Sequence, residues 1–316
     1  MLSRRNALAS LTGACTGGAL FAGPRSIALA QSPVVVRVGS GNVEANAEGF
    51  YALDRGFFKK NGIDANVMIM RSGGVTMEGI VAGELDTGVG NTASLGLALL
   101  RYIPFMVIAP AQNWDSRAPT AALIVAENSP IRSPKDLAGQ TLGVTSLGST
   151  AQVAFDAYLD KNGVDWTGVK YVELVPSSMA RAVESGRVVA GLLNDPELNA
   201  ALENTKVRKL SDGYSAIANQ FSFTAWFTSR NWIDKNKETA KRFADAIVSA
   251  GIWAESNRPA AMDILEKYTK FRETKSVIRF GHKLEPALLQ AVWDPAYRYK
   301  IFSGPLKATD YCWDGK

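Results

Sequence analysis

Short apolar runs alternate with stretches in which apolar residues recur every three or four positions, from residue 34 to residue 193. Such runs are typical of buried strands, and the spaced stretches predict helices with one apolar face. Strands that alternate with helices predict an α/β fold with mostly parallel sheets flanked by helices. The expected strands are residues 34–39, 67–70, 85–89, 103–109, 121–126, 142–145, 169–175 and 188–193. The expected helices are residues 46–60, 75–82, 92–102, 149–161, 177–184, 243–253 and 287–299, with His282 in a further helix.

One passage of this pattern recurs about a hundred residues later. Residues 60–64 read Lys-Asn-Gly-Ile-Asp and residues 161–165 read Lys-Asn-Gly-Val-Asp, each between a helical pattern and a strand-like one. Residues 80–89 and 183–192 share the spacing of their glycines and apolar positions. A single Asn-Gly after a helix is a common C-cap and carries little weight. The repeated order of cap, strand, helix and strand predicts two similar lobes with room for a ligand between them.

The alternation pauses at residues 112–119 and becomes extended and aromatic again at residues 218–228. We interpret the second segment as the return of the chain into the first lobe. The predicted division is lobe I from residues 31–115 and 218–316, and lobe II from residues 116–217.

The first thirty residues have the composition of an export signal. Arg4 and Arg5 precede an uncharged stretch, and Ala28-Leu29-Ala30 forms a small-x-small site, which predicts cleavage after Ala30 and a periplasmic protein. The uncharged stretch is shorter than the ~20 apolar residues that a membrane span needs.

Two features leave the export route open. Residues 3–8 resemble a twin-arginine signal, but Ala7 stands where that signal usually has an aromatic residue, so general secretion remains an alternative. Lipid attachment at Cys15 is a third alternative.

Loss of this segment changes the charge and the cysteine count. The formal charge of +5 falls to +2 because three arginines and no acid are removed, which gives no reason to expect a nucleic-acid partner. Only Cys312 remains, so no intrachain disulfide is expected. With 316 residues, 47% of them hydrophobic, the chain is long enough to build two hydrophobic cores without a disulfide.

Motifs for catalysis and for cofactors are absent. His282 is the only histidine, no Gly-x-Ser-x-Gly motif occurs, and no His or Cys pair has metal-ligand spacing. Residues 143–148 have the glycines of a phosphate loop but lack its lysine. Paired carboxylates stay possible, but we expect a binding protein with no catalytic residue, metal or cofactor.

Three segments resemble one family. Residues 45–64, Ala-Asn-Ala-Glu-Gly-Phe-Tyr-Ala-Leu-Asp-Arg-Gly-Phe-Phe-Lys-Lys-Asn-Gly-Ile-Asp, are similar to the opening of the periplasmic solute-binding proteins for alkanesulfonates, nitrate, taurine and thiamine-precursor pyrimidines. Residues 82–86 and 131–140 resemble two later segments of that family, and the likeness extends over residues 33–313.

The resemblance implies a two-lobed type II periplasmic-binding-protein fold. It also implies a monomer that delivers a small molecule to an ABC permease in the inner membrane. One branch of the superfamily is enzymatic and makes a pyrimidine from its own histidine, which lies beside a cysteine cluster. This sequence lacks that cluster and therefore does not match the enzymatic branch. A secreted enzyme of the same fold and a ligand-sensing receptor subunit remain alternatives.

The repeat also locates a ligand site at the ends of the strands. A shift of 103 residues superimposes Asn91 on Asn194, and we expect the two to face each other across a cleft. Both stand before helices, whose N-termini favour an anion or a carbonyl oxygen, although both are also good N-caps. The other expected ligand-binding residues are Asn42, Asn46, Ser72, Thr92, Gln112, Trp114, Ser146, Ser149, Thr150, Asp195 and Phe221.

Amides and hydroxyls dominate this set, while Trp114 and Phe221 are candidates for stacking on a planar ligand. The sequence therefore predicts a small polar organic ligand that bears a carboxylate or a sulfonate.

Overall fold

The computed structural model describes residues 32–272 and 277–315. The expected export signal, including Arg4, Arg5, Cys15 and Ala30, lies outside the described residues. The described residues from Pro33 onward form one compact unit. None of the helices in the described ranges combines the length and apolar character of a membrane span.

The first sheet has five strands in the order β2-β1-β3-β12-β4. β1 pairs in parallel with β2 and β3, while β12 is inserted antiparallel between β3 and β4. Four of the five strands therefore point the same way. The strands are β1 (Val34–Gly41), β2 (Ile63–Met70), β3 (Thr87–Asn91), β4 (Phe105–Pro110) and β12 (Thr224–Ser229).

The second sheet repeats this topology. Its order is β8-β7-β9-β6-β10, with β7 parallel to β8 and β9, and β6 inserted antiparallel between β9 and β10. The strands are β6 (Ala121–Ala126), β7 (Thr141–Val144), β8 (Lys170–Glu173), β9 (Ala190–Asn194) and β10 (Val207–Ser211). Two mostly parallel sheets of the same design confirm the predicted fold class.

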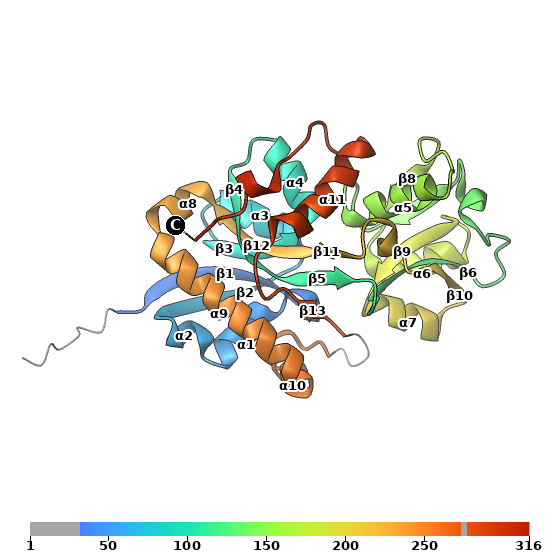
Figure 1. Cartoon of the computed structure of the whole chain (residues 1–316). Helices are drawn as coiled ribbons and strands as arrows, with labels where there is room; N and C mark the ends of the chain where they lie inside the picture. Colours follow the sequence, from blue (N-terminus) through green and yellow to red (C-terminus); the bar gives the residue numbers. More distant parts are fainter. Residues whose placement is uncertain (1–31, 273–276, 316) are drawn as a thin grey trace, which may run out of the picture. The chain divides into compact units, whose positions relative to one another are not determined.

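A third sheet has the order β11-β5-β13, formed by β5 (Gln112–Asp115), β11 (Gln220–Ser222) and β13 (Arg279–Phe280). β5 leads from the first sheet to the second and β11 leads back, and the two pair antiparallel (Figure 1). They fall where the sequence pattern pauses. The exact lobe boundaries at residues 115–116 and 217–218 remain a prediction.

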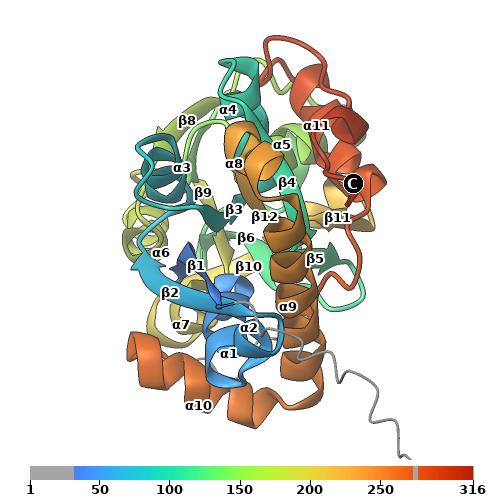
Figure 2. The same cartoon turned by 90° about the vertical axis from the view of Figure 1, so that its left-hand side faces the viewer.

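Eleven α-helices accompany the sheets in the described part of the chain. Near the first sheet, α1, α9 and α10 pack together (Figure 2), and the Phe50 ring of α1 stacks 5.3 Å from Tyr268 of α10. The helices are α1 (Glu48–Asp54), α2 (Phe57–Lys60), α3 (Gly73–Val81), α4 (Thr92–Leu100), α5 (Thr150–Lys161), α6 (Pro176–Glu184), α7 (Glu197–Asn204), α8 (Arg230–Lys235), α9 (Lys237–Ser256), α10 (Arg258–Thr269) and α11 (Pro286–Arg298).

The repeat extends to the way helices pack on the sheets. A Cβ atom on Gly88 of β3 would lie 2.1 Å from Thr76 Cγ2 of α3. A Cβ atom on Gly191 of β9 would lie 2.6 Å from Met179 Sδ of α6. Both pairs are related by the 103-residue shift. Each glycine lets the helix of its own half approach the sheet closely.

Two expectations about helices are wrong. The first helix does not continue to residue 60, because Gly56 has a left-handed backbone (φ 74°) and separates α1 from α2. His282 is not helical but lies in a bend between β13 and α11. Pro286 begins α11 just after it, and proline fits the first position of a helix.

Candidate functional site

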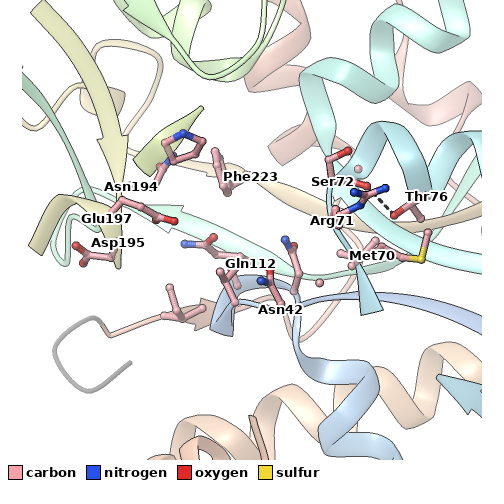
Figure 3. A pocket seen from close by; sticks show the side chains of 18 of the residues that line it. Asn42, Met70, Arg71, Ser72, Thr76, Gln112, Asn194, Asp195, Glu197 and Phe223 are labelled. Carbon is pink, nitrogen blue, oxygen red and sulfur yellow. Dashed lines mark hydrogen bonds between the residues drawn. The ribbon is translucent and has the colours of Figure 1, made fainter. Parts of the chain in front are cut away.

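A pocket of about 240 Å³ lies where strands of both five-stranded sheets end. The first sheet contributes the loop after β1 and the turn between β2 and α3, with Asn42, Asn46, Arg71, Ser72 and Thr76. The second contributes Pro176 at the start of α6 and the β9–α7 connection, with Asn194, Asp195 and Glu197. Gln112 of β5 and Phe223, between β11 and β12, also line it (Figure 3).

Several residues expected from the sequence are brought together here. They come from four separate segments of the chain, which meet because the strand ends converge. They are Asn42, Asn46, Ser72, Gln112, Asn194 and Asp195.

Asn91 has a different role from Asn194. Its Oδ1 accepts hydrogen bonds from the backbone N–H groups of Ala93 (3.1 Å) and Ser94 (3.3 Å), and from the hydroxyl of Thr150 (3.1 Å). Asn91 therefore caps α4 and is not among the residues that line the pocket. The residue that corresponds to Ala93 in the second half is Pro196. Proline has no N–H, so Asn194 cannot form the same cap.

The hydroxyls of Thr92 and Thr150 also form hydrogen bonds within the protein. The Thr92 hydroxyl donates to the carbonyl of Ser222 (2.6 Å), and its backbone N–H donates to the carbonyl of Phe223 (3.1 Å). The corresponding bond in the second half runs from the Asp195 N–H to the Thr120 carbonyl (2.8 Å). Phe223 and Thr120 both line the pocket, so the repeat places equivalent residues on its two sides.

The remaining expected residues lie away from the pocket. Trp114 and Phe221 are buried and stack on each other with ring centroids 6.1 Å apart, so neither ring faces a ligand there. Ser149 is buried at the start of α5, and Ser146 is half-buried in the loop before it. Neither lines the pocket.

Two charged groups of the pocket were missed. Arg71 directly follows β2, and Glu197 lies two residues after Asp195. The only sequence feature that could have identified them is a charged residue just after a predicted strand. A charged residue at a solvent-exposed surface position has the same feature. Within the described residues, no hydrogen bond or ion pair holds the Arg71 guanidinium.

A comparison with known families decides the relationship. The sequence profile described as NMT1/THI5 like matches residues 45–261, more than half of the chain. The chain belongs to the NMT1/THI5-like family.

Relatives of this family member are distant in sequence. A provisionally named binding protein of Brucella abortus (strain 2308) is 24% identical over 220 residues, which cover 69% of this chain and 66% of that protein. The crystal structure of the periplasmic aliphatic sulphonate binding protein SsuA from Escherichia coli is 20% identical, with a TM-score of 0.71 over 90% of this chain and 93% of SsuA. The likeness to SsuA confirms the periplasmic-binding-protein fold.

The same fold also occurs in an enzyme. The crystal structure of the desulfurization enzyme DSZB is 17% identical to this chain, with a TM-score of 0.63 over 88% of this chain and 96% of DSZB. In the described part of this family member, no cluster of three or more His, Cys, Asp or Glu side chains is arranged to hold a metal ion.

A buried carboxyl group lies beside the pocket loop. Glu48, at the start of α1, is only 1% exposed. Burial raises the pKa of Glu48 to about 8, which its own backbone N–H and the Trp226 indole oppose only in part. The nearby Glu44 differs because Arg258 forms an ion pair with it at 3.1 Å. Glu48 is therefore a neutral acid at pH 7, two residues after Asn46 of the pocket.

Proposed function

We propose that this protein is the substrate-binding component of an ABC-type importer. It captures a small polar molecule, bearing a carboxylate or a sulfonate, in the pocket between the two five-stranded sheets. The observation that carries the proposal is the convergence of amide, hydroxyl and charged side chains from both sheets on one small pocket. The fold and family agree with it. Export to the periplasm with cleavage after Ala30, a monomeric state and docking to a permease belong to the same proposal.

The proposed mechanism is a shift between open and closed forms. A ligand that contacts both walls makes its full set of contacts only when the walls are close, so binding favours the closed form. The paired strands β5 and β11 connect the two sheets, and the hinge is proposed near residues 113–119 and 218–221. The importer then recognises the closed form.

We expect small-angle X-ray scattering to show a smaller radius of gyration when the right ligand is added. A thermal-shift panel of sulfonates, carboxylates, nitrate and pyrimidines selects the ligand, because binding at a hundredfold excess over Kd stabilises a protein by about 2.7 kcal/mol. An unchanged radius with a saturating ligand would contradict the closing mechanism. A panel without any stabilising compound would contradict the proposed ligand class.

Arg71 is the proposed partner of the acidic group on the ligand. Arg71→Gln is expected to weaken binding roughly 10- to 100-fold, because a hydrogen bond to a charged group contributes about 1.5–3 kcal/mol. Isothermal titration calorimetry measures the change. Arg101→Gln is the matched control, since Arg101 is exposed and lies outside the pocket. Equal affinities for the two variants would remove Arg71 from the site.

The likeness to DSZB supports a second candidate, an enzyme of the same fold with carboxylate chemistry in the pocket. Asp195 is the acid expected from the sequence to act there. Mass spectrometry of a bound compound before and after incubation tests this candidate. Turnover that is lost in Asp195→Asn would favour the enzyme, and an intact compound would favour the importer component.

A further inference from the structure

A buried tyrosine outside the pocket contacts two residues that line it. Tyr214 lies in a short 3-10 helix between β10 and β11, and only 2% of it is exposed. Its hydroxyl is hydrogen-bonded to the side chain of Asn194, and its ring centroid lies 5.4 Å from that of Phe223. Asn194 and Phe223 both line the pocket, whereas Tyr214 does not (Figure 3). Tyr214 can therefore affect the pocket only through its neighbours.

Aromatic rings fix the position of Tyr214. Trp114 and Phe221 pack edge-on against its ring, with centroids 5.1 Å and 5.7 Å away. Trp114 belongs to β5 and Phe221 to β11, the two strands that connect the five-stranded sheets. A side chain packed this closely is confined to one position. The Tyr214 hydroxyl is thus held in place beside Asn194.

The chemistry of this hydroxyl decides how the Asn194 amide is oriented. Burial raises the pKa of Tyr214 above its ordinary value of 10, and Asn194 opposes this only in part, so the hydroxyl keeps its proton. A buried O–H needs an acceptor, and the amide oxygen of Asn194 supplies one. Pro196 has no N–H that would compete for this oxygen, unlike Ala93 beside Asn91. The Asn194 NH2 group, which only donates, is left over.

We propose that Tyr214 is a positioning residue that turns the amide N–H groups of Asn194 toward the ligand. This inference rests on the proposed binding function and adds to it a residue outside the pocket lining. The wall that carries Asn194 then presents a fixed donor to an oxygen of the acidic group. An asparagine that rotates freely would have to be ordered when the ligand binds, which lowers affinity.

A purely structural role for Tyr214 is the alternative to be tested. Tyr214→Phe keeps the ring and its packing and removes only the hydroxyl. Tyr299→Phe is the matched control, because the Tyr299 hydroxyl donates to Asp160 at 3.0 Å and neither residue lines the pocket. Both variants lose one side-chain hydrogen bond, so a loss of stability alone does not distinguish the two roles.

Nuclear magnetic resonance tests the contact without a ligand. The side-chain amide signals of Asn194 are assigned by their absence from the spectrum of Asn194→Ala. We expect both signals to move in Tyr214→Phe and to stay in place in Tyr299→Phe. Asn194 signals that are unchanged in Tyr214→Phe would overturn the proposal.

Calorimetry with methanesulfonate and acetate tests the effect on binding. Tyr214→Phe is expected to weaken binding of a probe about two- to tenfold, the range for one neutral hydrogen bond. In the Asn194→Ala background the same change is expected to have no effect, because Tyr214 acts through Asn194. An equal loss in both backgrounds would overturn the proposal.

A third variant tests the direction of the amide. Asn194→Asp keeps an acceptor for the Tyr214 hydroxyl but has no N–H to offer, so it is expected to bind the probes no better than Asn194→Ala. Wild-type affinity in Asn194→Asp would overturn the donor role. If neither probe binds the wild type, the Asn194 signals decide this inference, while the wider ligand panel with scattering decides the binding function independently.

Discussion

Glu48→Gln is expected to raise the free energy of unfolding at pH 7 by about 3 kcal/mol. Glu48 has a pKa of about 8 in the folded protein, because it is buried, whereas the ordinary pKa of this group is 4.5. At pH 7 the unfolded chain therefore ionises this group while the folded protein keeps it protonated. A shift of this size between the two states corresponds to about 3 kcal/mol that favours the unfolded state at pH 7. Glutamine has nearly the same shape and does not titrate.

The pH dependence has a definite sign. Because the folded pKa is the higher one, the stabilising effect of the protonated acid is complete below about pH 4 and is lost as the pH rises toward 8. Urea denaturation at pH 4 and pH 7 should show little difference between variant and wild type at pH 4, and a large one at pH 7. Glu84→Gln, in an exposed acid, is the control. A difference that does not change with pH would contradict the argument.

Gly88→Ala is expected to lower the free energy of unfolding by roughly 3 kcal/mol, at the upper end of the cost of overpacking a core. The new Cβ would lie 2.1 Å from Thr76 Cγ2 and 3.2 Å from the carbonyl oxygen of Gly39. Thr76 is buried and β-branched, so its methyl group has little freedom to move away. The backbone of Gly88 is not left-handed, and the cost therefore comes from the contact rather than from φ.

A double-mutant cycle isolates that contact. Thr76→Ser removes Cγ2 and keeps the hydroxyl that donates to the Ser72 carbonyl at 3.1 Å. Gly88→Ala should therefore cost at least about 1 kcal/mol less in the Thr76→Ser background. Gly191→Ala, its repeat equivalent, should be milder than Gly88→Ala because Met179 is flexible. Additive effects of the Gly88 and Thr76 changes would show that another contact is responsible.

Six of the thirteen expected site residues line the pocket, and helix capping explains some of the others. Sequence spacing places polar residues at strand ends, but the same hydroxyls and amides also cap helices. Asn91 caps a helix, and the hydroxyl of Thr150 donates a hydrogen bond to the same Asn91 side chain. Both side chains are therefore used in the cap. One feature of the sequence does separate Asn91 from Asn194. Pro196 lacks the backbone N–H that Asn194 would need to form a cap like that of Asn91.

Trp114 and Phe221 illustrate a different limit. Both stand at the crossings between the sheets, where an aromatic ring has the size either to stack on a ligand or to fill the core. Pairing of β5 with β11 places the two residues opposite each other. Their rings then pack together with Tyr214, and none is left for the pocket. Only the register of these two strands, which are 105 residues apart, decided the outcome.

The sequence by itself determined the alternation of strands and helices, the repeat at 103 residues and the family, because these are properties of local periodicity and spacing. It also determined that polar groups collect at the ends of the strands. The tertiary structure decided which of those groups turn toward the pocket and that Arg71 faces Asp195 and Glu197. The reason is physical: an exposed charge at a strand end looks the same in sequence whether it meets solvent or an opposing wall, and only the pairing of distant segments supplies that wall.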